Sequence, residues 1–310
     1  MKKFVEKYTF IWPLLGSLIL WGLIGAVSGR FTANQLFSCA RLASFALLLA
    51  LGQMVVVTSG EGAIDLSQVY ILTLCAYMSC NLMNVNPVLG FVAAIAVGAL
   101  CGFVNGCINI YLKVPAMITT LATGYIIFTI ILIGAPHMTT LPYAGLVSLI
   151  NMNFGGFSML TVICIAVAAV LAVLLYKTKY GKQLHAVGQK RLAARYSGIA
   201  VGRVVITAFT LGGALCGLAG VLCGAFIGGA FQDMGSTYFL PSIAAAFVGG
   251  TAAAGGRSNV LGVCLGALMM SFMTTFLNAA SLSPGMQRLI QGAFLVLILV
   301  ASVSNAVKKK

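Results

Sequence analysis

Residues 157–176 read FSMLTVICIAVAAVLAVLLY, twenty residues without a charged side chain. A helix needs about 20 apolar residues to cross the hydrocarbon core of a bilayer. The stretch is apolar on all sides, whereas strands of a membrane β-barrel alternate apolar and polar residues over about ten positions. It therefore predicts a membrane-spanning helix.

Nine further apolar segments predict an all-α polytopic membrane protein with about ten transmembrane helices in a compact bundle, and counts of nine to eleven remain open. The eighth is short and rich in small residues, which indicates a broken or re-entrant helix. The weaker stretch 141–150 suggests a surface helix. The segments are 10–28, 36–57, 66–84, 87–111, 115–134, 157–176, 204–226, 240–254, 259–279 and 287–305.

The composition fits a lipid environment. Hydrophobic residues make up 61% of the 310 residues and charged residues 7%, against roughly 25% in soluble domains. The mean hydropathy is +1.07. These values exclude an ordinary cytosolic enzyme, a disordered chain and a small secreted scaffold. No stretch is long and polar enough for a separate soluble domain, so residues 1–310 are expected to form a single transmembrane domain.

The formal net charge is +14, with 18 Lys and Arg against four acids. Basic residues occur in short clusters beside apolar segments, which favours membrane orientation over nucleic-acid binding. With both termini in the cytoplasm of a bacterium, 15 of the 18 basic residues lie inside, and only Arg30, Arg41 and Arg288 lie outside. The charge pattern therefore predicts a multi-pass protein of the inner membrane with an even number of spans.

The N-terminal apolar run, 10–28, is too long for a typical signal peptide and is interpreted as the first retained span. The nine cysteines lie almost entirely inside apolar segments and form no CxxC pair. They are interpreted as small buried residues, with neither a disulfide nor a metal site.

Glycines recur at helical spacing in several segments. Such a stripe lets two helix backbones approach closely in lipid, where hydrophobicity does not drive helix association. We therefore expect tight helix packing in both halves of the chain. The stripes are Gly98, Gly102 and Gly106; Gly220, Gly224 and Gly228; Gly213 with Gly217; and Gly262 with Gly266.

The chain lacks an energy source of its own. There is no GxxxxGK[ST] phosphate loop, because Gly181-Lys182 is followed by Gln183. Charges in the middle of spans are nearly absent, so an ion-coupled carrier would have to use Glu61 or Asp65. No nucleophile–base pair or metal-ligand motif is present, which argues against an enzyme.

The longest polar segment, 177–203, lies on the cytoplasmic side by its charge. Residues 190–196 can form a short helix, preceded by Gly188 and stopped by Gly198. Ala193 and Ala194 would present a flat surface ringed by Arg191 and Arg195. This surface suits docking into a groove of a cytoplasmic protein, and a solvated basic loop is the simpler alternative.

Two breaks and a few polar residues are candidates for a solute path. In TSGEGAIDLS, residues 58–67, glycines interrupt the helix, and Asp65 either caps the next helix or belongs to a gate. In 244–257, two glycine pairs beginning with Gly249-Gly250 indicate a hinge or a partly inserted helix. The in-span polar residues Gln53, Asn105, Asn109 and Asn278 either line the path or make interhelical hydrogen bonds.

In order and spacing these segments resemble the permease subunits of bacterial ribose-type sugar ABC importers, over residues 35–305. The resemblance rests on IDLS at 64–67, on the loop with Gly188, Ala193, Ala194, Ser197, Gly198 and Ile199, on GLAG at 217–220, and on GGT at 249–251 with Gly255-Gly256. It implies about ten helices per subunit, a coupling helix at 188–199 seated on an ATPase, and a transport function without enzymatic activity.

The resemblance also implies partners. These are a second permease, identical or paralogous, two cytoplasmic ATPases that bind ATP and Mg²⁺, and a periplasmic or lipid-anchored sugar-binding protein. No cofactor is expected in this chain. Lys190, Arg191 and Arg195 would join the coupling set, and Glu61, Asp65 and Ser67 the gate.

The sequence departs from the family pattern at the gate, where SGEGAIDLS replaces GGIDLS and Ser258 replaces a glycine. Related branches carry nucleosides, branched-chain amino acids or a sugar-derived signal, so the solute class stays open among these.

Overall fold

The computed structural model describes residues 10–28 and 32–307. They form helices joined by short connections and one two-stranded antiparallel hairpin. The elements are α2 (Ile11–Ser28), α3 (Ala33–Thr58), α4 (Gln68–Met83), α5 (Pro87–Tyr111), α6 (Ala116–Gly134), η1 (Ala135–His137), α7 (Ala144–Asn151), β1 (Asn153–Phe154), β2 (Phe157–Ser158), α8 (Met159–Lys177), α9 (Lys179–Gln189), α10 (Arg191–Tyr196), α11 (Val201–Ile227), η2 (Ser236–Tyr238), α12 (Phe239–Val248), α13 (Val260–Ala279) and α14 (Pro284–Val307).

A helix lies at each of the ten predicted apolar segments. Among the described residues, six helices are long and apolar enough to cross a membrane by themselves, namely α3, α5, α6, α8, α11 and α13. The other four, α2, α4, α12 and α14, contain shorter apolar stretches. The chain is therefore a polytopic helical membrane protein. As expected, 141–150 contains a short helix, α7, and α12 ends where the Gly249-Gly250 pair begins.

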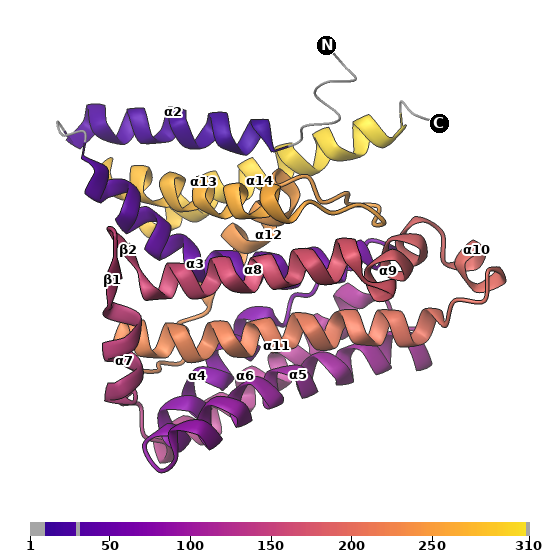
Figure 1. The fold of residues 1–310 in the computed structure, drawn as a ribbon, viewed down its shortest axis with the longest axis horizontal. Coiled ribbons are helices and arrows are strands. Elements are labelled where there is room, and N and C mark those ends of the chain that lie inside the picture. The colour runs from indigo at the N-terminus through magenta and orange to yellow at the C-terminus, as the bar shows by residue number, and fades with distance from the viewer. Residues whose placement is uncertain (1–9, 29–31, 308–310) are drawn as a thin grey trace.

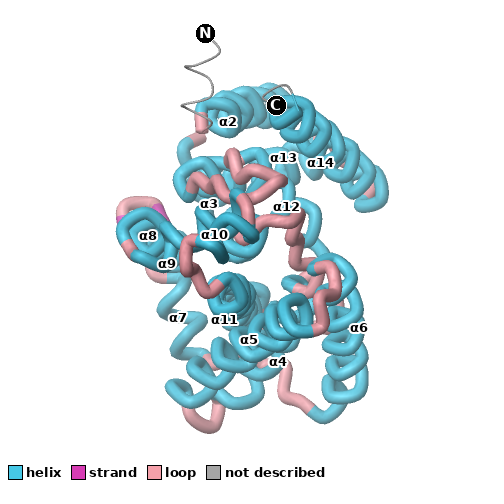
Figure 2. Tube along the Cα trace, turned by 90° about the vertical axis from the view of Figure 1, so that its right-hand side faces the viewer, coloured by secondary structure: helices cyan, strands magenta, loops and turns pink. Residues whose placement is uncertain are grey.

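Helix α3 lies at the centre of the molecule. It packs on α11 on one side and on α12 and α13 on the other (Figures 1 and 2). Its C-terminal two-thirds, residues 43–58, are buried without interruption. Helices α4, α5, α6 and α11 form one group beside it, and α2, α12, α13 and α14 form the other. The end of α3 therefore touches both halves of the bundle.

Backbone-to-backbone packing joins α5 to α11, the most extensive helix pair. A Cβ on Gly102 would overlap the carbonyl of Phe209, and a Cβ on Gly213 would overlap the carbonyl of Gly98. Gly262 likewise contacts the carbonyl of Gly249, which joins α13 to α12. These contacts confirm the predicted packing role of the glycine stripes on α5 and α13.

The prediction for the third stripe is only partly right. A Cβ on Gly220 would overlap the backbone of Leu72 in α4, whereas Gly224 would make only ordinary contacts. Gly228 lies in no helix interface, because it ends α11 in a left-handed conformation with φ +89°. Spacing alone did not separate a packing glycine from a terminating one.

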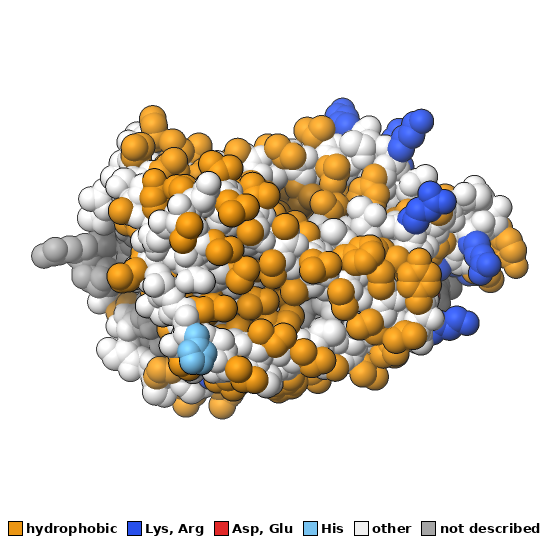
Figure 3. Space-filling model, turned by 90° about the horizontal axis from the view of Figure 1, so that it is seen from below, with side chains coloured by type: hydrophobic (Ala, Val, Ile, Leu, Met, Phe, Trp, Pro, Cys, Tyr) orange, Lys and Arg blue, Asp and Glu red, His pale blue; other side chains and the backbone are white. Residues whose placement is uncertain are grey.

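Basic side chains gather at one end of the molecule. In Figure 3 the Lys and Arg side chains cluster at the end where α9 and α10 lie. We call it the basic end, defined by α9, α10 and the turn 249–258. The loop 138–143, the hairpin β1–β2 and the loop 228–235 lie at the opposite end, called the far end. The terminal lysines, Lys2, Lys3, Lys7 and Lys308 to Lys310, and Arg30 lie outside the described residues.

Gly102→Ala should destabilise the protein in detergent, because the new methyl group meets the Phe209 carbonyl and the two helices must separate. Overpacking costs about 1–3 kcal/mol. Gly292→Ala is the matched control, since nothing lies within 4 Å of its Cβ position on α14. The melting temperature should fall for Gly102→Ala and stay level or rise for Gly292→Ala. Equal melting temperatures for both variants would contradict the packing role of Gly102.

Candidate functional site

Residues 59–67 form the break between α3 and α4. Three successive residues, Gly60, Glu61 and Gly62, have positive φ of 89°, 56° and 65°. Such a run is incompatible with a right-handed helix, and it favours glycine at two of its three positions. The helix therefore stops at Thr58, and the chain continues as an irregular segment until α4 starts at Gln68.

A chain of hydrogen bonds runs from the break into α5 and α6. The N–H and hydroxyl of Ser67 donate to Asp65 Oδ1 at 2.9 and 2.6 Å. Asn105 Nδ2 donates to Ser67 Oγ at 2.9 Å, and Thr123 Oγ1 donates to Asn105 Oδ1 at 2.6 Å. Asp65, Ser67 and Asn105 are completely or almost completely buried. Buried polar groups need such partners, because desolvation is costly without them.

Gln53, Gln68 and Thr120 complete this cluster. Thr120 Oγ1 accepts from the Leu66 N–H at 3.0 Å. In the amide orientation that gives both atoms partners, Gln53 accepts from the Asp65 N–H and donates to the Asp65 carbonyl, each at 3.2 Å. We call Gln53, Asp65, Ser67, Gln68, Asn105, Thr120 and Thr123 the polar cluster. It draws side chains from α3, α4, α5, α6 and the break.

The two carboxylate oxygens of Asp65 differ in their contacts. Asp65 Oδ2 is buried and has no hydrogen-bond partner among the described residues. An unsatisfied carboxylate oxygen in an interior costs free energy, so a water molecule, a proton or a passing hydroxyl group would be stabilised there.

The predicted cap on α4 is wrong in its details. Asp65 accepts from the N–H of Ser67, which itself precedes α4, and the helix has no side-chain cap. The carboxylate therefore closes the turn in front of the helix.

The predicted path residues divide into two groups. Gln53, Asp65, Ser67 and Asn105 meet in the polar cluster. Asn109 lies outside it, because its Nδ2 donates to the Val114 carbonyl at 2.8 Å in the α5–α6 turn. Asn278 is exposed at the end of α13 and accepts from Gln287. Gly249 packs on the backbone of α13, and Gly250 turns the chain after α12.

At the basic end three glycines from distant segments touch. A Cβ on Gly60 would lie 2.8 Å from the carbonyl oxygen of Gly188, and a Cβ on Gly255 would overlap Gly60. The N–H of Gly256 donates to the Thr58 carbonyl at 3.0 Å. We call Gly60, Gly188 and Gly255 the glycine contact. It joins the break, α9 and the turn 249–258 without intervening side chains.

An ion pair lies beside the glycine contact. Arg191 Nη1 is 2.7 Å from Glu61 Oε2, the one ion pair within residues 10–28 and 32–307. The Arg191 side chain is only 18% exposed, whereas Glu61 is 64% exposed. Burial lowers the pKa of Arg191, and the neighbouring Glu61 carboxylate opposes that shift. The pair fixes the start of α10 to the break.

A short helix, α10, lies where the sequence predicts one, but its outward face differs from the prediction. Arg191 points inward, and Ala194 and Gly188 are buried. The outward face instead carries Leu192 and Tyr196, which are 56% and 82% exposed. Lys190, Ala193, Arg195, Ser197 and Gly198 are also exposed, and Ile199 is partly buried. Gly188 lies in helix α9 and not in a loop.

Hydrogen bonds also connect α9 and α8 to the segment around the start of α13, and the sequence does not predict them. His185 Nε2 lies 3.0 Å from Ser258 Oγ, and Tyr176 OH accepts from the Val260 N–H at 2.9 Å. These contacts join α8, α9 and the start of α13. In the sequence Ser258 is only a departure from the family glycine, and no local signal pairs it with His185.

Among the described residues, no group of three His, Cys, Asp or Glu side chains lies close enough to hold a metal ion. Gly181 and Lys182 lie within helix α9.

Comparison with known proteins identifies the family of this chain. The family model described as "Branched-chain amino acid transport system / permease component" matches residues 35–299. The chain belongs to this family of transport permeases.

Two relatives cover nearly the whole chain. The ribose import permease protein RbsC of Escherichia coli (strain K12) is 31% identical over 307 residues, covering 94% of this chain and 92% of RbsC. The autoinducer 2 import system permease protein LsrC of Shigella flexneri is 30% identical over 309 residues, covering 97% and 88%. No solved structure matches. The resemblance to ribose-type permeases is thus confirmed.

Within this permease, Ser67→Ala should be much more damaging than Ser79→Ala. Ser67 both donates to Asp65 and accepts from Asn105, whereas the equally buried Ser79 only donates to a carbonyl of its own helix. Leaving buried groups unsatisfied costs about 1–3 kcal/mol. Thermal unfolding in detergent should show the lower melting temperature for Ser67→Ala. If Ser79→Ala is equally destabilised, the polar cluster is not what holds the break.

Reversing the Glu61–Arg191 pair offers a second test. Glu61→Arg and Arg191→Glu should each loosen α10, because like charges would replace an ion pair worth about 0.5–1 kcal/mol. Exchanging both residues should restore the contact. Hydrogen exchange of peptides covering 58–67 and 190–198 should rise in each single variant and return toward wild type in the double variant. No recovery in the double variant would show that the pair is not the connection.

Proposed function

We propose that this permease is the membrane subunit of an ATP-driven importer that moves a monosaccharide or a related small polar solute into the cell. The observation that carries the proposal is the direct contact between α10, whose outer face is exposed, and the break that holds the polar cluster. A protein that displaces α10 would thereby displace the break. The printed names of RbsC and LsrC, import permeases for ribose and autoinducer 2, support the solute class.

In this proposal the chain is one permease domain with ten membrane-crossing helices. The basic end and both termini face the cytoplasm of a bacterial inner membrane. The gathering of Lys and Arg at the basic end supports this orientation, because positive loops are retained on the cytoplasmic side (Figure 3).

The partners are proposed from the family. A cytoplasmic ABC ATPase that binds ATP and Mg²⁺ would dock on α10, a periplasmic or lipid-anchored binding protein would deliver solute at the far end, and a second permease, identical or paralogous, would complete the pair. Leu192, Ala193, Arg195 and Tyr196 would form the ATPase-docking face. Leu192 and Tyr196 are large apolar side chains at a basic, solvent-exposed end, as expected for the anchors of an interface.

Rigid displacement is the mechanism that this arrangement supports. The glycine contact leaves no flexible side chain between α9 and the break, so movement of α9 and α10 reaches Thr58 directly. Small shifts then switch a packed element between two arrangements. As the break moves, the side chains of the polar cluster would exchange hydrogen-bond partners. This exchange would open or close the passage beside the cluster.

One observation favours a second candidate, an ion-coupled carrier. Asp65 Oδ2 is buried without a partner among the described residues, as a proton-binding carboxylate would be. The two candidates differ in a simple assay. The purified chain alone in proteoliposomes should not concentrate D-ribose under a proton or sodium gradient. Uphill uptake under either gradient would favour the carrier.

Placing charge on the outer face of α10 tests the proposed function directly. The double variant Leu192→Asp with Tyr196→Asp should lose the ATPase subunit on affinity purification of the tagged permease from its host membranes. The matched control, Leu141→Asp with Phe154→Asp, changes two exposed apolar residues at the far end and should retain the ATPase. Retention by the α10 variant, with normal membrane insertion, would contradict the docking role.

A further inference from the structure

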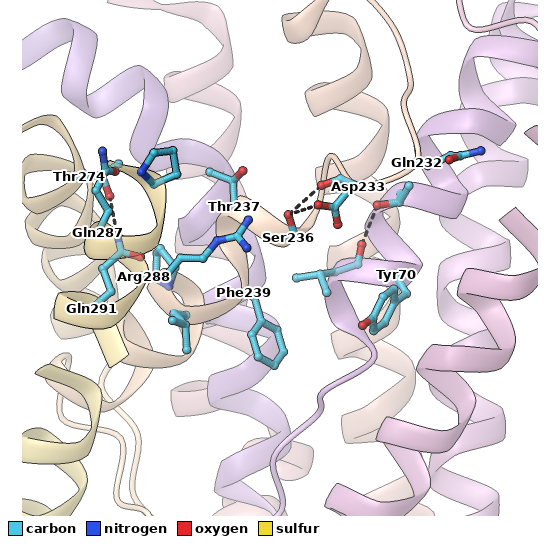
Figure 4. Close-up of a pocket in the computed structure, with 15 residues that line it drawn as sticks. Tyr70, Gln232, Asp233, Ser236, Thr237, Phe239, Thr274, Gln287, Arg288 and Gln291 are labelled. Carbon is cyan, nitrogen blue, oxygen red and sulfur yellow. Dashed lines mark hydrogen bonds between the residues drawn. The ribbon is translucent and has the colours of Figure 1, made fainter. Parts of the chain in front are cut away.

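A cavity of about 300 Å³ lies between α4, α12, α13 and α14, away from the basic end. Figure 4 shows its residues converging from these helices and from the segment 232–241. The volume is at the lower end of the range for small-molecule sites, about 300–1,000 Å³. The lining residues are Val69, Tyr70, Thr73, Gln232, Asp233, Ser236, Thr237, Phe239, Leu240, Pro241, Thr274, Pro284, Gln287, Arg288 and Gln291.

The lining is unusually polar for this chain. Ten of its fifteen residues carry hydrogen-bonding side chains, in a protein with 61% hydrophobic residues. Most of these polar residues come from the segment 232–237 and from the first turns of α14, so the cavity lies toward the far end, where its polar groups can meet a solute that arrives from water.

Two opposite charges face this cavity from different elements. Arg288 of α14 points toward Ser236 and Asp233 across the space (Figure 4). Ser236 Oγ donates to Asp233 Oδ2 at 2.9 Å. Asp233 and Arg288 form no ion pair with each other, and the Arg288 guanidinium has no hydrogen-bond partner within residues 10–28 and 32–307. The lining therefore offers free donors on one wall, free acceptors on another, and no net charge.

Two aromatic rings give the cavity apolar faces. Phe239 lies at one wall and Tyr70 at another. Sugars combine hydroxyl groups with an apolar C–H face, so a wall with both ring faces and hydrogen-bonding groups matches them. A carboxylate can accept from two neighbouring hydroxyl groups, and a guanidinium can donate to others.

The cavity is adjacent to the polar cluster. Tyr70 and Thr73 lie on α4 just after Ser67 and Gln68, which belong to that cluster. Gly124 of α6 lies against both the Tyr70 ring and the Cα of Ser67. On the other side, Gly235 approaches the backbone of Val69 so closely that a Cβ would overlap it. A solute leaving the cavity along α4 reaches the polar cluster within about one helical turn.

We propose that this cavity holds the imported solute at the far side of the break and selects a neutral, polyhydroxylated molecule of monosaccharide size. The inference rests on the proposed import function and adds the residues and the ligand chemistry. Asp233 and Arg288 bind hydroxyl groups, and their opposite charges leave no net attraction for an anion or a cation.

Thiol protection tests the cavity without requiring transport. Thr237 is exposed beside it, so Thr237→Cys should react with a membrane-impermeant maleimide added to the purified permease. D-ribose or D-galactose at tens of millimolar should slow that reaction at least threefold, while L-leucine and D-ribose 5-phosphate should not. Ser148→Cys on α7 is the matched control, because it is exposed at the far end but outside the cavity. The unmodified chain, whose nine cysteines are buried or partly buried, gives the background.

Adding Asp233→Asn or Arg288→Gln to Thr237→Cys should raise the sugar concentration for half-protection at least fivefold, with labelling in the absence of sugar unchanged. Absence of protection by either sugar overturns the proposed site, and protection by L-leucine alone overturns the ligand class. Equal half-protection in the charge variants overturns the assigned roles of Asp233 and Arg288. A complete importer that fails to use ATP for uptake would instead contradict the proposed function and leave the labelling result valid.

Discussion

The direct contact of three backbones at Gly60, Gly188 and Gly255 is the constraint on which the rest of the structure depends. It joins three segments that are at least 67 residues apart in the sequence, and no side chain larger than hydrogen fits at any of the three positions. Packed interiors transmit displacement because they have little free space. The neighbouring hydrogen bond from Gly256 to Thr58 and the Glu61–Arg191 ion pair add directional contacts to the same junction. The end of the buried helix α3 is consequently in direct contact with α9, and the Glu61–Arg191 ion pair adds a contact to the start of α10.

The polar cluster explains why a break at this place is stable. An irregular segment among membrane helices must find partners for its own backbone groups, since lipid offers none. Gln53 and Thr120 supply partners for the backbone at Asp65 and Leu66, and Asp65, Ser67 and Asn105 satisfy most of one another's side-chain atoms. The cluster is complete enough to hold the chain in place, and the single unsatisfied oxygen of Asp65 leaves one position for a transient partner.

Much of the fold could be predicted from the sequence because lipid imposes a simple rule of length and hydropathy, and each predicted apolar segment contains a helix. The short helix α10 and its stop at Gly198 also follow from local signals. The direction in which a side chain points does not follow from such local signals. Arg191 turns inward because Glu61, 130 positions earlier, lies beside it, and Tyr196 thereby becomes the outward residue. In the sequence Asn105 and Asn278 are both asparagines within apolar segments. In the structure Asn105 donates to Ser67, whereas Asn278 accepts from Gln287. Such outcomes depend on contacts between distant segments, which no local pattern records.

The short length of α12 has a consequence for how this part of the chain crosses the membrane. Ten helical residues extend about 15 Å, roughly half of a hydrocarbon core about 30 Å thick. The remaining depth beside it is filled by the turn 249–258, whose backbone is held by α9 and the break. α12 is therefore too short to cross the hydrocarbon core by itself, and the irregular backbone that follows it finds its partners in α9 and the break and not in lipid.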